Sequence, residues 1–398
     1  MTDPSAARYA HLGPFDGLVA AAKAVRPLFG QPPVPGGESR RRAKESLRFT
    51  IAYEQPQDIR IGRAWIADGV RGEEISWSVG FGPRTEGLVL KPAEGGARLP
   101  GIVALHDHGH FKFFGKEKIA DGPDGCPAPL AGFRQTYYGG RAYANRLARA
   151  GFVVLAHDAF LWGSRKFPLE IMPDRERALA EAVGATLEQD YAGPEIVRYN
   201  GAALLHEHLV SKYCTMLGTS FSAMIAHEDR VALNVLRMRT DVAPTHIGCV
   251  GLSGGGLRAA LMRATSDELA ACVIVGMMST YEALLSDCVA PHTWMLFPAG
   301  WSEAGDWPDL AESAAPSPLL VQFLLDDELF TADGMRNADL RLAAAYARAN
   351  APEAYRGEFY PGPHRFDIPM QEAALAWLQS RLSARPTGAG ETTSRSPP

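Results

Sequence analysis

The chain has 398 residues, of which 46% are hydrophobic and 21% are charged, a balance typical of a folded globular protein rather than a disordered or fibrous one. The formal charge is only -5, whereas binding to nucleic acid or to an anionic membrane usually requires a concentrated basic face. No apolar run reaches the roughly 20 residues of a transmembrane helix, and no secretory signal is visible at the start. Five scattered cysteines without a C-x-x-C pair suit a reducing compartment. We therefore expect a cytoplasmic protein that binds neither nucleic acid nor membrane.

The first part of the chain predicts a helix and then an antiparallel set of strands. Residues 14–29 have helical apolar spacing, whereas residues 31–45 are rich in Pro and Gly and then basic, which is typical of a solvated connector. From about residue 47 to residue 92, segments of alternating polarity predict strands of an antiparallel edge or meander. These segments read SLRFTIAYE, DIRIGRAWIA, EISWSVGFG and EGLVLKPA. The apolar and aromatic content of this N-terminal extension is compatible with a homodimer.

Buried strands and helices alternate over most of the remaining chain. Mainly apolar runs predict strands, most of them covered on both faces, at 99–106, 152–158, 246–253, 270–278, 318–327 and 355–362. Helical spacing predicts helices at 141–151, 227–241, 255–264, 333–350 and 367–382. This alternation predicts an α/β protein with a mostly parallel central sheet flanked by helices.

Two stretches, residues 111–139 and 165–226, fall outside the alternation. Insertions of this kind are where an α/β enzyme builds a lid or a substrate wall, although surface decoration is the alternative. We predict an N-terminal extension over residues 1–74 and a catalytic domain over residues 75–383, with a helical, lid-like insertion at about 165–226. The tail, residues 384–398, is rich in Pro, Gly, Ser and Thr, and we expect it to be disordered.

The strongest chemical signal is Gly251-Leu252-Ser253-Gly254-Gly255, which matches G-x-S-x-G between a predicted strand and a predicted helix. A sharp turn at this point projects the serine hydroxyl out of the sheet, and the flanking glycines avoid Cβ clashes in strained backbone. The N–H of Gly254 and the start of the helix would stabilise a negatively charged oxygen. Ser253 is therefore the predicted nucleophile, and the alternative is a glycine-rich turn with an incidental serine.

A serine hydroxyl needs a base, and proteins with this motif carry the acid and then the histidine later in the chain. Two histidines follow Ser253. His364 comes just after a predicted strand, in a loop that could bring its imidazole to the serine, whereas His292 lies in an irregular segment. His364 is the predicted base.

The acid that orients the imidazole is expected at the end of the strand 318–327, where Asp326 and Asp327 are adjacent. Because neighbouring side chains of a strand point to opposite sides, only one of the two is expected to face the histidine. We favour Asp327, with Asp326 second and with Glu282 and Asp287 as weaker alternatives.

The loop after the strand 99–106 is expected to supply a second oxyanion donor, the backbone N–H of His108 or Gly109. His106, His108 and His110 alternate here, and an H-x-H pattern at a strand end can also bind zinc. Because Gly109 is expected to break the strand, we expect His106 to pack or to form hydrogen bonds below the site and the site to contain no metal or cofactor. Asp158, at the end of another buried strand, is expected to brace neighbouring loops by accepting N–H bonds.

Taken together, the segments LHDHG, FVVLAHD and GLSGGG, the Asp326-Asp327 pair and PGPHRF resemble the α/β-hydrolase superfamily. More narrowly, they resemble its dienelactone hydrolase-like and acetyl xylan esterase-like bacterial branch, over roughly residues 75–383. The resemblance implies the α/β-hydrolase fold. It also implies these roles: nucleophile Ser253, acid Asp327, base His364, and oxyanion donors at Gly254 and at the His108/Gly109 loop. Dienelactone hydrolases proper use a cysteine nucleophile, so the serine found here favours ester hydrolysis.

We expect a serine hydrolase that cleaves a small-molecule carboxylic ester through an acyl-enzyme. One alternative is a carbon–carbon bond, amide or thioester hydrolase, or a lyase, on the same scaffold, because a fold does not fix its reaction. The others are a catalytically silent binding protein and a metal-dependent hydrolase.

Overall fold

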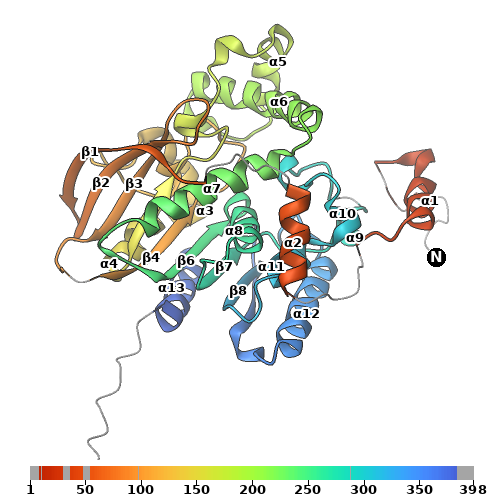
Figure 1. The fold of residues 1–398 in the computed structure, drawn as a ribbon. Coiled ribbons are helices and arrows are strands. Elements are labelled where there is room, and N and C mark those ends of the chain that lie inside the picture. The colour runs from red at the N-terminus through yellow and green to blue at the C-terminus, as the bar shows by residue number, and fades with distance from the viewer. Residues whose placement is uncertain are drawn as a thin grey trace, which may run out of the picture.

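The computed structural model describes residues 9, 11–29, 36–47, 54–96, 98–286 and 288–382. At its centre lies a nine-stranded sheet in the order β1-β2-β3-β5-β4-β6-β7-β8-β9 (Figure 1). The strands are β1 (Gln57–Ala67), β2 (Val70–Ser78), β3 (Thr85–Pro92), β4 (Leu99–Leu105), β5 (Val153–His157), β6 (Val242–Leu252), β7 (Ala271–Val275), β8 (Leu319–Leu324) and β9 (Tyr355–Tyr360). The first three strands are antiparallel, and β3 pairs antiparallel with β5. All pairs from β5 to β9 are parallel, so the predicted mostly parallel sheet with an antiparallel edge is confirmed.

Helices cover both faces of the sheet and create two hydrophobic cores. Because successive side chains of a strand point to opposite faces, Val103 and Val153 belong to one core and their neighbours Ile102 and Val154 to the other. The first core includes α2 (Gly36–Leu47), α7 (Phe221–Arg237), α8 (Gly254–Thr265), α11 (Trp307–Glu312) and α12 (Ala332–Arg348). The second includes α3 (Ala131–Tyr138), α4 (Tyr143–Arg149) and α13 (Ile368–Leu382). Burial on both faces explains the continuous apolar runs of the sequence.

The remaining helices lie in the N-terminal region, in the insertion at 165–226 and between β7 and β8. They are α1 (Gly17–Val25), α5 (Asp174–Gly184), α6 (Pro194–Met216), α9 (Tyr281–Leu284) and α10 (Trp301–Ala304). Short 3-10 helices are η1 (Gly13–Phe15), η2 (Lys116–Lys118), η3 (Ala128–Leu130), η4 (Gly163–Arg165), η5 (Leu169–Ile171), η6 (Asp190–Ala192), η7 (Trp294–Leu296) and η8 (Pro352–Ala354). In Figure 1, α5 and α6 form a pair that projects beyond the sheet. The two helices pack closely, since a Cβ on Gly201 would lie 2.2 Å from the Ala180 carbonyl oxygen.

The prediction of a connector at residues 31–45 is wrong where the structure describes that segment, because α2 begins at Gly36. Glu38 pairs with Arg41 and Arg42 at helical spacing, which stabilises an exposed helix face. The opposite face buries Ala43 and Leu47 in the first core. The strand predicted at residues 46–54 is also wrong at its start, since α2 extends to Leu47, and residues 48–53 lie outside the described residues.

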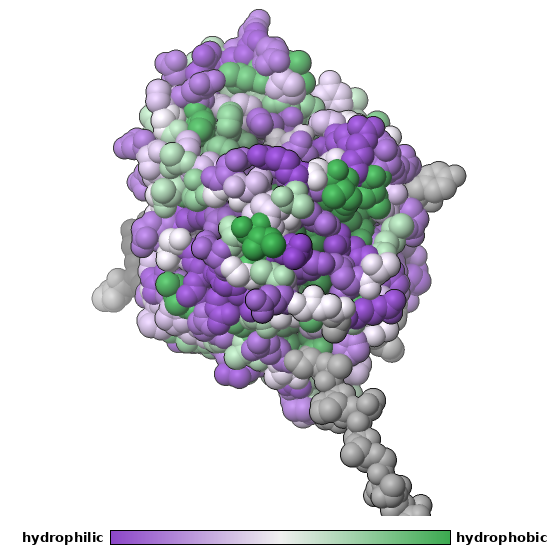
Figure 2. Space-filling model, turned by 90° about the vertical axis from the view of Figure 1, so that its left-hand side faces the viewer, coloured by the Kyte–Doolittle hydropathy of each residue, from purple (hydrophilic) through white to green (hydrophobic). Residues whose placement is uncertain are grey.

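β1 forms one edge of the sheet, and its side chains are mostly exposed. Figure 2 shows the side of the molecule on which β1–β3 lie, and its surface is largely hydrophilic with small, separate apolar patches. Ile61 and Ile66 are exposed on β1, and Arg60 and Arg63 lie on the same strand. Charged residues on an edge strand disfavour pairing with another sheet. These features do not test the predicted homodimer, which stays a prediction.

The predicted domain limits also stay predictions, although residue 75 lies inside β2, a strand that is paired on both sides. The tail, residues 384–398, lies outside the described residues. Within the described part of the chain, every helix is too short or too polar to cross a membrane.

Candidate active site

Ser253 occupies a strained turn between β6, which ends at Leu252, and α8, which begins at Gly254. Its backbone angles are φ 57° and ψ -120°, a conformation that non-glycine residues rarely adopt. The neighbouring glycines are required by close approach of the backbone. A Cβ on Gly251 would lie 2.4 Å from the Gly255 carbonyl carbon, and a Cβ on Gly255 would lie 2.3 Å from the Leu105 carbonyl oxygen. The strand–turn–helix context expected for Ser253 is therefore present.

His364 follows β9 and forms a hydrogen bond with Asp327, which follows β8. His364 Nδ1 lies 2.6 Å from Asp327 Oδ2, and the Asp327 side chain is 1% exposed. The other carboxylate oxygen of Asp327 accepts the N–H of Leu329 at 3.0 Å. Asp326 is exposed and accepts the N–H of Gly362 at 2.6 Å, so it holds the turn that carries the histidine instead of contacting the ring.

The predicted site residues line one cavity of about 460 Å³. They are Ser253, His364, Asp327, Gly254, His108 and Gly109. The Ser253 hydroxyl and the His364 ring are not hydrogen-bonded to each other in the described structure. Such a separation is common before substrate binds, because catalytic hydrogen bonds often tighten only in the substrate complex.

The loop after β4 lies directly against the start of α8. A Cβ on Gly254 would lie only 2.6 Å from the backbone nitrogen of His108. Within the described part of the chain, the backbone N–H groups of Gly254, His108 and Gly109 donate no hydrogen bond. Backbone N–H groups close to a serine hydroxyl and at a helix N-terminus can stabilise negative charge on oxygen.

Glu207 of α6 fixes this loop from the insertion. One carboxylate oxygen bonds His108 Nε2 at 3.0 Å and forms an ion pair with Lys112. The other accepts the Thr293 hydroxyl at 2.6 Å and the Trp294 N–H at 3.0 Å. Burial alone would raise the pKa of Glu207, but the Lys112 charge and the His108 bond lower it well below its ordinary value. Sequence reasoning missed Glu207, because helical spacing does not distinguish a buried glutamate from a solvated one.

His106, which precedes the loop, has partners of its own. His106 donates from Nδ1 to the Asp107 carbonyl at 2.9 Å, and its Nε2 accepts the N–H of Ala159 at 3.2 Å. The expected role of His106, packed and hydrogen-bonded below the site, is confirmed. No three His, Cys, Asp or Glu side chains of the described residues are arranged to hold a metal ion.

The alternative base and acids are placed less favourably. His292 lines the same cavity, but its Nε2 donates to the Leu329 carbonyl at 3.0 Å, and burial lowers its pKa to about 4. Glu282 of α9 pairs with Lys23 and does not line this cavity. Asp287 lies outside the described residues.

Asp158 has the bracing role predicted for it. It accepts the backbone N–H of Lys116 at 2.8 Å and that of Ser164 at 2.9 Å, and it also pairs with Lys116 Nζ at 3.0 Å. Asp158 therefore joins the segments of Lys116 and Ser164 at the carboxyl end of β5.

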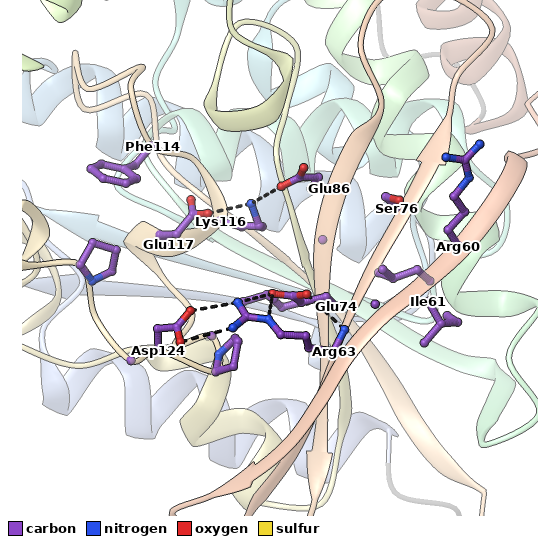
Figure 3. A pocket seen from close by; sticks show the side chains of 18 residues that line it. Arg60, Ile61, Arg63, Glu74, Ser76, Glu86, Phe114, Lys116, Glu117 and Asp124 are labelled. Carbon is purple, nitrogen blue, oxygen red and sulfur yellow. Dashed lines mark hydrogen bonds and ion pairs between the residues drawn. The ribbon is translucent and has the colours of Figure 1, made fainter.

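A second cavity, of about 490 Å³, is lined by residues of β1–β3 and of the segment 114–127 (Figure 3). Its central charged side chains are paired: Arg63 pairs with Glu74 and Asp124, each at 2.9 Å, and Lys116 pairs with Glu117 and Asp158. Figure 3 shows Arg63 lying between its two carboxylate partners. No serine–histidine pair lines this second cavity among the described residues, so the first cavity is the candidate active site.

Comparison with known proteins shows similarity at the level of the fold. No family model matches it. It is 22% identical over 294 residues to "Putative hydrolase YtaP" of Bacillus subtilis (strain 168). The alignment covers 74% of this chain and 82% of that protein. Among solved structures, a "putative acetyl xylan esterase" of Bacteroides fragilis NCTC 9343 aligns with a TM-score of 0.65 and 16% identity, over 88% of this chain and 82% of the other. A glucuronoyl esterase from Solibacter usitatus aligns with a TM-score of 0.58 and 12% identity, over 87% and 92%. These similarities show that the chain has the α/β-hydrolase fold.

Proposed function

We propose that the protein is a serine-dependent hydrolase of carboxylic esters, with Ser253 as nucleophile, His364 as base and Asp327 as the acid. The observation that carries the proposal is the 2.6 Å contact between His364 and Asp327 in the same cavity as Ser253, which occupies a strained strand-to-helix turn. A histidine held by a buried carboxylate and a serine on such a turn are the parts that acyl transfer requires. Esterase names among the structural relatives support the same reaction class.

In the proposed reaction, His364 Nε2 takes the proton of the Ser253 hydroxyl as the serine oxygen attacks the ester carbonyl carbon. Asp327 fixes the ring so that Nδ1 carries the other proton, and it stabilises the imidazolium that forms. The tetrahedral intermediate then expels the alcohol, which receives the proton from Nε2. Water, deprotonated by the same imidazole, attacks the acyl-serine, and collapse of the second intermediate releases the acid and restores Ser253.

The backbone N–H groups of Gly254 and of His108 or Gly109 are the proposed oxyanion donors. They bind the carbonyl oxygen as it becomes negatively charged, and the start of α8 adds a favourable potential. Loss of one such donor typically costs about 10²–10³ in kcat.

A fluorophosphonate probe followed by peptide mapping tests the nucleophile directly. We expect stoichiometric labelling of Ser253 in the folded wild-type protein and none in Ser253→Ala. A panel of p-nitrophenyl esters, matched amides, thioesters and a β-diketone tests the bond that is cleaved. Faster turnover of an amide, thioester or carbon–carbon bond than of every ester would replace the ester assignment, and unaltered turnover by Ser253→Ala would refute the mechanism.

A further inference from the structure

The acidic side chains that line the active-site cavity are not balanced by basic ones. Among the described residues that line it, none is lysine or arginine. Three lining carboxylates, Glu188, Asp326 and Glu328, belong to exposed residues and therefore lie where the cavity meets solvent. Low-dielectric walls that carry charge of one sign raise the local concentration of oppositely charged molecules and exclude those of the same sign.

Three cations around the site are not available to a ligand. Lys112 and Lys118 are buried, and they are paired with Glu207 and Asp107 respectively. Arg365, next to the proposed base, is turned to Asp367 at 2.8 Å. The cavity therefore offers no free cation, among the described residues, that could balance a carboxylate or phosphate on a substrate.

Two of the lining histidines, His110 and His292, do not supply positive charge either. Burial lowers the pKa of His110 to about 3 and that of His292 to about 4, so both rings are neutral near pH 7. The ring of His108 is buried and bonded to Glu207. A neutral imidazole donates one hydrogen bond from its protonated nitrogen and accepts one at the other nitrogen, which suits an uncharged polar group.

The rest of the lining is divided between apolar and neutral polar side chains. Much of the apolar part comes from α8 and from the segments that follow β7 and β8, and it includes Leu257, Met277, Leu296, Leu329 and Phe330. The neutral polar part includes Thr136 and Tyr137 of α3. A cavity of about 460 Å³ with this composition fits a small molecule with one apolar group.

We infer that the substrate is an electrically neutral or cationic ester with an apolar group, and that the acidic rim discriminates against esters bearing a free carboxylate or phosphate. This inference rests on the proposed function, because it concerns the same cavity. The exposed carboxylates Glu188 and Glu328 are the specificity-determining residues, and they act on the approach and binding of substrate rather than on bond cleavage.

A matched set of p-nitrophenyl esters tests the inference at pH 7.5. The acyl groups are the adipic acid monoester, which carries a terminal carboxylate, and the adipamic acid ester, which carries a neutral amide of the same length. A 6-(trimethylammonio)hexanoate ester supplies the positive charge. At low salt we expect kcat/KM for the anionic ester to be about tenfold or more below that for the amide, and the difference to shrink towards threefold at 0.5 M NaCl, because exposed charges are screened.

The double variant Glu188→Gln/Glu328→Gln should reduce the amide-to-carboxylate ratio of kcat/KM by about threefold or more. Glu353→Gln, which removes an exposed carboxylate away from the cavity, should leave the ratio unchanged. Equal or faster turnover of the anionic ester, or a ratio insensitive to both salt and the double variant, would overturn the substrate class while leaving the esterase proposal intact. Failure to hydrolyse all three esters, together with failure of the fluorophosphonate to label Ser253, would overturn the proposed function and this inference with it.

Discussion

Replacement of Glu207 is the sharpest test of how the insertion supports the site. Glu207→Ala removes a buried carboxylate that binds His108, Lys112, Thr293 and Trp294. The ammonium of Lys112 is then left buried without its counter-charge. Breaking a buried ion pair from one side typically costs about 3–5 kcal/mol. Since whole-protein stabilities are about 5–15 kcal/mol, we expect a loss of that size to be plainly measurable.

Equilibrium urea unfolding, followed by both tryptophan fluorescence and far-UV circular dichroism, measures the effect. Coincidence of the two transitions is needed before a single free energy of unfolding is assigned. Glu181→Ala, an exposed glutamate on the neighbouring helix α5, is the matched control and should change stability by about 0.5 kcal/mol or less.

Both partners of the ion pair between Lys112 and Glu207 can also be replaced together. Apolar replacement of both partners of a buried ion pair is often neutral or stabilising, so Lys112→Met/Glu207→Met should be more stable than Glu207→Ala. In the ester assay, Glu207→Gln should lower kcat more than it raises KM, because it disturbs the loop that carries the proposed oxyanion donors. A loss below about 1 kcal/mol for Glu207→Ala, or a double variant no more stable than the single one, would refute the reasoning.

Three further predictions concern the proposed machinery and one buried acid. Asp327→Asn should lower kcat about 10⁴-fold, whereas Asp326→Asn should have a much smaller effect, and equal effects in steady-state kinetics would reverse the choice of acid. Gly254→Ala should lower kcat about 10²–10³-fold, because its Cβ would lie 2.6 Å from the His108 nitrogen; wild-type rates in a folded variant would contradict the proposed oxyanion site. Burial raises the pKa of Glu312 to about 7, so the folded protein binds this proton more tightly than the unfolded chain. The resulting stability is present below the unfolded pKa and is lost as pH rises towards 7. Glu312→Gln should therefore gain stability relative to wild type between pH 5 and pH 8, by at most about 3 kcal/mol, and urea unfolding that gives the same difference at both pH values would disprove it.

Local sequence patterns predicted much of the α/β framework. They also predicted the residues that line the candidate active-site cavity. Ser253 could be located because the glycines around it are a steric requirement of the turn, and this requirement is written in five consecutive residues. Asp327 was favoured over Asp326, and the structure turns Asp327 towards His364 and Asp326 towards Gly362. The catalytic roles of these residues stay a proposal.

Features that depend on packing between distant segments could not be predicted. The basic run of α2 suggested a solvated connector, because its helix becomes evident only where Ala43 and Leu47 enter the core. Glu207 lies about 100 residues from His108 along the chain, and no local pattern marks a glutamate whose partners come from two other segments. Long-range burial, rather than propensity, decides both cases.

The backbone angles at residue 253 lower the stability of the fold, although the turn that carries the proposed nucleophile requires them. A non-glycine residue at positive φ carries a cost of about 1–3 kcal/mol, which glycine would largely avoid. The sequence that is most stable at this turn is thus one that lacks the proposed nucleophile. Consensus engineering, or selection for a higher melting temperature, should therefore leave residue 253 unchanged. Selection for melting temperature alone would favour replacement of the proposed nucleophile.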